Sequence, residues 1–271
     1  MASGGLGEPF SVDPRLVEDF QRLGHGAVRT LASVDEIARY KPAIDEATMA
    51  RRFDRRPLAE RDTYGRAFIQ SANVFQHDPQ VAEFVLARRF ASVAARLLGC
   101  DGVRLYHDQA LYKEPGGGHT PWHQDQVYWP LETDRTITMW MPLVDVPADI
   151  GGVTFADESW RDGNLGDLTI GDESHAHFER VVERYSLSTH GPFQAGDATF
   201  HRGWTLHCAP ANDTSIMRSV ITVIYFADGT TISDPVPSNA NFDHVLWLGG
   251  KVPGSLADGD TNPLLWHESW A

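Results

Sequence analysis

The first hundred residues carry apolar side chains at helical spacing between short polar stretches. Asp13 and Pro14 form an N-cap followed by proline, the usual start of a helix. The apolar positions that follow recur at intervals of one, three and four residues: Leu16, Val17, Phe20 and Leu23. Gly24 ends this pattern, so the sequence predicts a first helix that stops there.

Two further helix starts follow in the same part of the chain. Ser33 and Glu36 fit a capping box, and the helix that they open is expected to be interrupted or closed by Pro42. Asp78–Pro79 repeats the start signal ahead of residues 80–98. We expect those residues to form one long amphipathic helix that ends at Gly99.

The pattern changes to short apolar runs after residue 100. These runs alternate with Gly, Pro and Asp clusters, which is typical of strands joined by tight turns. The predicted strands are 103–112, 136–144, 152–155, 197–200 and 216–226. Several short strands at close spacing favour a β-sandwich or jelly roll.

Composition and charge exclude several classes of function. The net charge is -14 at pH 7, which argues against nucleic-acid binding because phosphate neutralisation needs a basic surface. The sequence has neither an apolar run long enough for a membrane span nor an N-terminal secretion signal. Two cysteines, Cys100 and Cys208, are too few for a disulfide framework. We therefore expect a cytoplasmic protein that acts away from membranes, whereas its oligomeric state is not readable from these numbers.

The segment around His123, Gln124 and Asp125 carries candidate metal ligands. In an extended chain, residues i and i+2 point to the same side, so His123 and Asp125 would present an imidazole and a carboxylate together. A distant histidine would complete a two-His-one-carboxylate set, which leaves iron positions open for oxygen and a bidentate co-substrate. His207 and His201 both lie in a suitable later segment.

Arg218 is a candidate for binding an anionic co-substrate. It follows His207 by eleven residues and lies within the predicted strand 216–226, where burial of a charge is costly unless an anion pairs with it. A guanidinium binds a carboxylate through two parallel hydrogen bonds, so Arg218 suits the distal carboxylate of a dicarboxylate co-substrate. An internal salt bridge or a solvated strand edge explains Arg218 equally well when it is taken by itself.

These motifs together resemble the phytanoyl-CoA dioxygenase family, a branch of the Fe(II) and 2-oxoglutarate dependent oxygenases. The similarity runs from about Phe20 to Phe226. Besides the N-terminal helices and the residues above, it rests on segments that occur in the order expected for the family: 108–117, 122–130, 138–143, Gly151–Gly152–Val153 and 203–207.

The resemblance implies a mainly β fold with flanking helices, in which a double-stranded β-helix core of the jelly-roll or cupin-like type follows N-terminal helices. It implies one domain over residues 1–271. Its expected parts are a flexible N-terminus at about 1–9, a mainly helical part at 10–100, the β-helix core at 101–230 and a C-terminal extension at 231–271. The apolar residues of that extension, Trp266 among them, are expected to pack back on the core.

The resemblance also implies roles for individual residues. His123, Asp125 and His207 match the iron ligands, and Arg218 matches the arginine that pairs with 2-oxoglutarate. The further co-substrate and pocket residues that it implies are Gln109, Trp140 and Thr138. The chain departs from the family pattern at Ala209, where a serine that bonds the co-substrate is common, and at Trp160, where a histidine is common.

The implied activity is that of a dioxygenase that uses Fe(II), 2-oxoglutarate and O2 to oxidise a small molecule, expected to be a hydroxylation, with release of succinate and CO2. Asp125 favours a hydroxylase over a halogenase, in which a small residue stands at that position. Epimerisation, desaturation and cyclisation would use the same residues, so these reactions are kept as alternatives to hydroxylation. A non-catalytic cupin-like protein that binds a small molecule is the alternative from another class.

Overall fold

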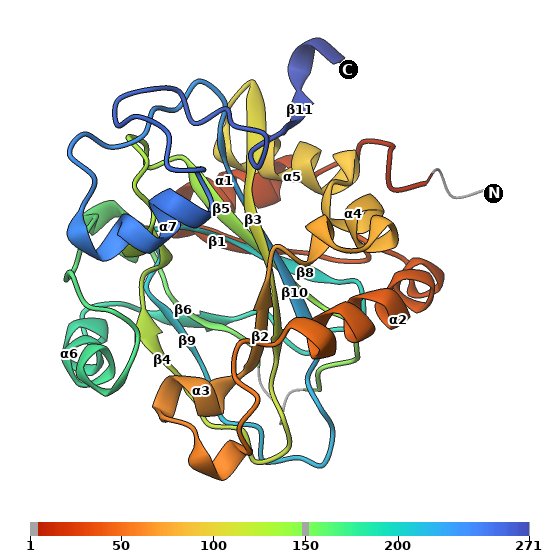
Figure 1. Cartoon of the computed structure of the whole chain (residues 1–271), viewed down its shortest axis with the longest axis vertical. Helices are drawn as coiled ribbons and strands as arrows, with labels where there is room; N and C mark the ends of the chain where they lie inside the picture. The colour runs from red at the N-terminus through yellow and green to blue at the C-terminus, as the bar shows by residue number, and fades with distance from the viewer. Residues whose placement is uncertain (1–4, 148–151, 271) are drawn as a thin grey trace.

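The computed structural model describes residues 5–147 and 152–270, and its centre is a large antiparallel sheet (Figure 1). Along this sheet the strand order is β1 (His25–Val28), β8 (Ala198–Arg202), β5 (Thr136–Pro142), β10 (Val220–Ala227), β3 (Gly102–Tyr112) and β11 (Leu264–His267), and β2 (Ile69–Ala72) also pairs with β3. A smaller antiparallel sheet has the order β4 (Thr120–His123), β9 (His207–Ala209), β6 (Thr154–Ala156) and β7 (Leu187–Thr189). Two antiparallel sheets with non-sequential neighbours are the arrangement of a jelly roll, as the sequence predicted.

The central strands are buried along their whole length. Every residue of β5 and β10 is buried, and both strands are rich in β-branched and aromatic side chains. Each strand expected in the second half of the chain exists, although its ends differ by a few residues. The largest difference is at β10, which begins at Val220 and not at residue 216. Arg218 therefore lies just before the strand, in a single bridge to Lys113.

The first two predicted helix starts are confirmed by the structure. Helix α1 (Pro14–Leu23) begins after Asp13, whose side chain accepts a hydrogen bond from the Arg15 amide, and ends at the left-handed Gly24. Helix α2 (Val34–Arg51) begins with the predicted capping box at Ser33. The expected stop at Pro42 is wrong, because α2 continues through that proline.

The reason is tertiary packing. Ile37, Tyr40 and Ile44 form a buried face of α2 on both sides of Pro42. Proline removes one backbone hydrogen bond from a helix and introduces a clash that costs about 3 kcal/mol. Burial of three large side chains contributes about 1.5–3 kcal/mol each, which is enough to keep the helix intact.

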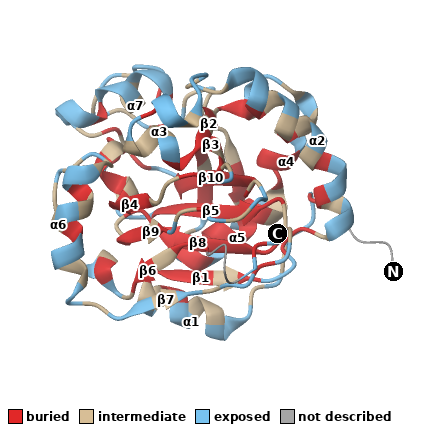
Figure 2. Ribbon diagram, turned by 90° about the horizontal axis from the view of Figure 1, so that it is seen from below, coloured by how far each residue is buried: buried red, intermediate tan, exposed pale blue. Residues whose placement is uncertain are grey.

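The predicted single helix over residues 80–98 is also wrong. The chain forms α4 (Pro79–Val85) and α5 (Arg88–Leu98), with extended backbone at Ala87 between them. This break lets both helices turn apolar faces inward, and the ring centres of Phe84 and Phe90 lie 5.1 Å apart. Helix α5 packs against the large sheet, and Figure 2 shows its neighbouring strands buried inside a partly exposed shell of helices.

Segments at both ends of the chain are tied to the core. β1 and β2, which the sequence pattern did not predict, add strands from the N-terminal part to the large sheet. Residues 1–4 of the expected flexible N-terminus lie outside the described residues, but Leu6 is buried in the core, in contrast to that expectation. In the C-terminal extension, β11 pairs with β3 and Trp266 is buried, as predicted, whereas Trp270, which was expected to pack on the core as well, is exposed.

The remaining described α-helices are α3 (Thr63–Ala67), α6 (Asp172–Val182) and α7 (Asn241–Leu246). Gly151 of the Gly–Gly–Val motif lies outside the described ranges. Within those ranges, none of the helices is both long and apolar enough to cross a membrane. Cys100 and Cys208 are free thiols, in agreement with the expectation from their number.

Candidate metal centre

A cavity of about 380 Å³ lies between the two sheets. Its lining combines side chains from β3, β5 and β10 of the large sheet with side chains from β4 and β9 of the small sheet. His123, Asp125 and His207 all line it, together with Arg218. The fold thus brings together four residues that are separated by up to 95 positions in the sequence.

Local backbone geometry explains why His123 and Asp125 point the same way. Strand β4 ends at His123, Gln124 keeps an extended backbone, and Asp125 opens the 3-10 turn Asp125–Tyr128. The side chain of Gln124 turns away from the cavity, where its amide donates to the carbonyls of Gly163 and Trp204. The alternation expected from the sequence is therefore present.

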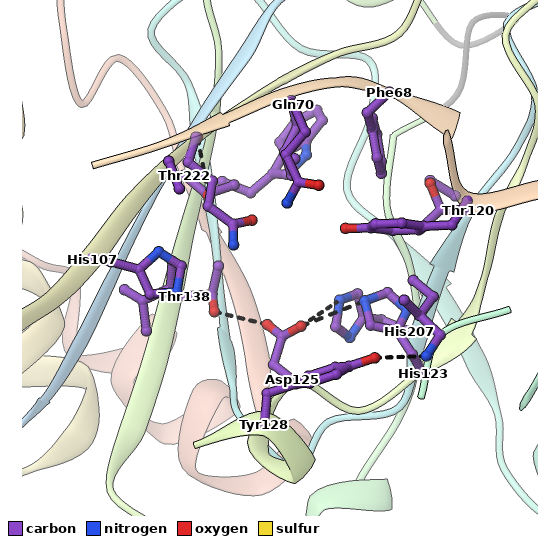
Figure 3. A pocket seen from close by; sticks show the side chains of 18 of the residues that line it. Phe68, Gln70, His107, Thr120, His123, Asp125, Tyr128, Thr138, His207 and Thr222 are labelled. Atoms are coloured by element: carbon purple, nitrogen blue, oxygen red, sulfur yellow. Dashed lines mark hydrogen bonds and ion pairs between the residues drawn. The ribbon is translucent and has the colours of Figure 1, made fainter. Parts of the chain in front are cut away.

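The three candidate ligands offer one donor atom each within 4.8 Å of one another. Asp125 Oδ1 lies 3.4 Å from His123 Nε2 and 3.8 Å from His207 Nε2. In both histidines the other ring nitrogen, Nδ1, bonds a backbone carbonyl, that of Pro121 at 2.8 Å and that of Thr205 at 2.9 Å. These bonds fix the orientation of both rings, and Figure 3 shows the labelled histidines His123 and His207 beside the carboxylate of Asp125.

The second carboxylate oxygen of Asp125 has its own partners. Thr138 Oγ1 donates to Oδ2 at 2.9 Å, and His201 Nε2 lies 3.2 Å from the same oxygen. His201 therefore contacts the second oxygen of Asp125, and its ring centre lies 4.3 Å from that of His207. The donor set that converges is the one with His207, and His201 is placed to support the carboxylate.

The electrostatics of the group suit a divalent cation. Burial alone would raise the pKa of Asp125, but His207, His123 and His201 outweigh it and hold that pKa well below its usual range. Burial, followed by the neighbouring His123 and His201, lowers the pKa of His207 well below its ordinary value. An ionised carboxylate with neutral imidazoles is the protonation state that metal binding requires.

Arg218 is the only arginine or lysine in the described lining of the cavity. Its side chain is 1% exposed, and burial lowers its pKa to about 10, so that it stays charged at neutral pH. The guanidinium lies 5.6 Å from the ring centre of Trp140. A fixed, buried cation of this kind is suited to an anionic ligand.

The remaining predicted pocket residues, Gln109, Trp140 and Thr138, all line the cavity. Thr138 and Trp140 lie on one face of β5, as expected from their spacing. The hydroxyl of Thr138, however, is engaged with Asp125, so its contact is with a candidate ligand.

Residues that the sequence reasoning missed also line the cavity. Thr120 lies directly opposite Ala209 in the β4–β9 pair, and both border the cavity. Phe242, Asp243 and Trp247 reach it from α7 and the residue after that helix. The sequence offered no signal for α7, because its register relative to the sheets is set by tertiary contacts alone.

The other histidines take different positions. His107 lines the cavity. The rings of His119 and His175 lie outside the described lining with their centres 4.6 Å apart, and His175 is half-buried. His177 lies on α6 and contacts the carbonyl of Leu165.

Comparison with known proteins agrees with this geometry. The chain is similar to a probable alpha-ketoglutarate-dependent hypophosphite dioxygenase of Stutzerimonas stutzeri, with 24% identity over 153 residues, which are 54% of this chain and 53% of that protein. The match thus spans about half the length of the curated relative.

Solved structures are similar over most of the chain. The carbocyclase SnoK from nogalamycin biosynthesis superposes with a TM-score of 0.76 at 23% identity, covering 95% of this chain and 99% of that one. The epimerase SnoN, in complex with Fe3+, alpha-ketoglutarate and nogalamycin RO, gives 0.75 at 26% identity, covering 93% and 97%. EctD from S. alaskensis, with 2-oxoglutarate and 5-hydroxyectoine, gives 0.64 at 18% identity, covering 85% and 83%.

The match to a family model is broader than the match to the curated relative. Residues 20–220 match the model for phytanoyl-CoA dioxygenase, and this range contains every candidate ligand and Arg218. The chain therefore belongs to the phytanoyl-CoA dioxygenase family.

Proposed function

We propose that this protein is an Fe(II) and 2-oxoglutarate dependent dioxygenase that oxidises a small molecule. The observation that carries the proposal is the convergence of His123, Asp125 and His207 in a cavity that also contains the buried Arg218. Family membership supports the same class of enzyme.

The donor atoms fit iron. Two imidazole nitrogens and one carboxylate oxygen form the facial set that is typical of non-haem Fe(II) oxygenases. The carbonyls of Pro121 and Thr205 hold Nδ1 of the two histidines, and Thr138 holds the second oxygen of Asp125. Such outer contacts orient ligands before the metal arrives, so the site is prepared for a cation.

Arg218 would hold the distal carboxylate of 2-oxoglutarate, with Trp140 packed beside its guanidinium. Gln109 and Thr120 offer polar groups on the neighbouring strands β3 and β4. When bound, the iron and 2-oxoglutarate would supply the oxidation of a substrate C–H bond, with release of succinate and CO2. The residues of this chain would bind and orient the reactants.

Hydroxylation is the outcome that we propose first. The carboxylate of Asp125 occupies the position that a halide would need, which disfavours halogenation. Epimerisation is the second candidate, because similarity to SnoN extends over 93% of the chain at 26% identity. A binding protein without turnover would have no use for a donor set that leaves metal positions open.

The test is spectroscopic. Fe(II) and then 2-oxoglutarate are added to metal-free protein without oxygen, and the visible spectrum is recorded. We expect a charge-transfer band that needs both additions, is absent in His123→Ala and weakens in Arg218→Lys.

A matched control is Arg202→Lys, which changes another buried arginine that stacks on Trp160 and not on Trp140. This variant should keep the band. Absence of the band in folded wild-type protein would overturn the proposal and favour the binding-protein alternative.

A further inference from the structure

A second carboxylate lines the cavity at the end formed by α7. Asp243 accepts a hydrogen bond from Tyr106 Oη at 3.0 Å. Across the described residues, no ion pair includes Asp243. Burial raises its pKa to about 7, against the hydrogen bonds from Tyr106 and Trp247 that lower it. A carboxylate in this setting is costly to ionise unless a cation pairs with it.

His107 adds a second hydrogen-bond acceptor near this end. Its Nδ1 lies 3.3 Å from the carbonyl of Asp108, so Nδ1 carries the proton and Nε2 is left as an acceptor. Burial lowers the pKa of His107 to about 4, which keeps the ring neutral at physiological pH. The His107 ring lies 5.0 Å from that of Trp247, next to α7. This end of the cavity therefore offers hydrogen-bond acceptors from His107 and Asp243.

The charged groups of the described lining point the same way. The described lining contains two carboxylates, Asp125 and Asp243, and one arginine, Arg218. In the proposed function, Arg218 would bind doubly charged 2-oxoglutarate at the metal end, and no ion pair among the described residues joins it to Asp243. The negative charge of Asp243 is then left for the substrate to neutralise.

Aromatic rings surround this carboxylate. Trp247 is buried, and its ring centre lies 6.0 Å from that of Phe242. Tyr128 lies within electrostatic reach of both Asp243 and Asp125: burial chiefly raises its pKa to about 12, and both carboxylates contribute. Tyr128 thus links the α7 end to the metal end, and Figure 3 shows it beside Asp125. Aromatic faces favour both flat apolar groups and cations.

We propose that the substrate of this enzyme carries a protonated amine, which pairs with Asp243, on an apolar or aromatic body that packs between Trp247 and Tyr128. This inference rests on the proposed function, because it takes the metal end as the reacting end. It assigns the choice of substrate to α7, which lies beyond the residues matched by the family model. An acyl-CoA substrate, with its several phosphates, is disfavoured by the same carboxylate.

The experiment uses three probes with one ring system: tryptamine as the cation, tryptophol as the neutral analogue and indole-3-acetate as the anion. Each is titrated calorimetrically, without oxygen, into protein that has first been loaded with Fe(II) and 2-oxoglutarate and shows the charge-transfer band. We expect tryptamine to bind at least about ten-fold more tightly than the other two, since a buried hydrogen bond to a charged group contributes about 1.5–3 kcal/mol.

Two variants test whether Asp243 is responsible for the preference for tryptamine. Asp243→Asn should weaken tryptamine binding by about ten-fold or more and leave tryptophol within about two-fold, because only the charge is removed. Asp260→Asn, at an exposed position of the same C-terminal extension, should change neither affinity.

Equal affinities for the three probes in the wild type, no binding of tryptamine, or a preference that survives in Asp243→Asn would overturn the inference. The wild-type comparison needs no variant to fold. Loss of the charge-transfer band, by contrast, would remove the proposed function itself, so the two failures are distinguishable.

Discussion

The hydroxyl of Thr138 donates a 2.9 Å hydrogen bond to Oδ2 of Asp125, whereas Oδ1 of that carboxylate faces the Nε2 atoms of His123 and His207. One oxygen is thus held by the large sheet and the other is left for a metal. Because β5 is buried throughout, Thr138 is a rigid support for a residue that itself lies at the start of a 3-10 turn.

Replacement of Thr138 by valine tests this support. Val has the same shape as Thr but cannot donate a hydrogen bond, so Asp125 loses one of the contacts that fix its rotamer. We expect Fe(II) affinity to fall by about ten-fold, the lower end of the range for outer contacts of metal ligands. Anaerobic titration with Fe(II) measures this. Thr222→Val is the matched control, because Thr222 Oγ1 donates to the Gln109 carbonyl and not to Asp125; equal losses in both variants would contradict the assigned role.

The same substitution at His201 and at His207 distinguishes their roles in iron binding. We expect His207→Gln to lose stoichiometric iron, because it removes one of three ligands. His201→Gln should retain iron with an affinity lowered by about ten-fold, because it removes only a contact to Asp125 Oδ2. Iron content after gel filtration measures both. Retention of iron by His207→Gln together with its loss from His201→Gln would show that the ligand is the other histidine.

The family often has a serine at the position where this chain has Ala209. We infer that Thr120 supplies the hydrogen bond of that serine. The two residues are paired across β4 and β9, and Thr120 Oγ1 accepts a 3.3 Å hydrogen bond from Lys113, which leaves its own proton available to a ligand. Thr120→Val should weaken 2-oxoglutarate binding by about two- to ten-fold, the range for one net hydrogen bond. Addition of Ala209→Ser to that variant should recover part of the loss. Titration of the visible band gives both affinities, and an unchanged value in Thr120→Val would refute the interpretation.

The pH dependence of stability should report the buried carboxylate of Asp243. Its pKa rises from 3.8 to about 7 on folding, so the folded state binds this proton more tightly than the unfolded state. Below about pH 4 both states are protonated and there is no cost, and as the pH rises to about 7 the folded state loses stability. Three pKa units correspond to at most about 4 kcal/mol.

Urea denaturation of metal-free protein at pH 5 and pH 8 measures this cost. Asp243→Asn should gain stability relative to the wild type at both values and gain more at pH 8, because at pH 5 only the first part of the loss has occurred. Asp260→Asn is the control and should follow the wild type at both values. A difference between wild type and Asp243→Asn that does not change with pH would show that Asp243 is ionised throughout.

The sequence by itself determined the local features of this protein. The cap at Asp13, the capping box at Ser33 and the stop at Gly99 depend on bonds within a few residues, so they could be predicted. The same holds for His123 and Asp125, whose common direction follows from an extended backbone. The alternation of apolar runs also predicted the β-rich second half, and the resemblance to a family led to His207 and Arg218.

Tertiary structure alone decided the rest. Pro42 stays inside α2, and residues 80–98 divide at Ala87, because burial against the core outweighs the local signals. The positions of Thr120 opposite Ala209, and of Asp243 on α7 at the far end of the cavity, depend on contacts between segments that are distant in the chain. No pattern in a short window encodes such contacts. The candidate metal ligands could therefore be named from the sequence, whereas the α7 end of the cavity could not.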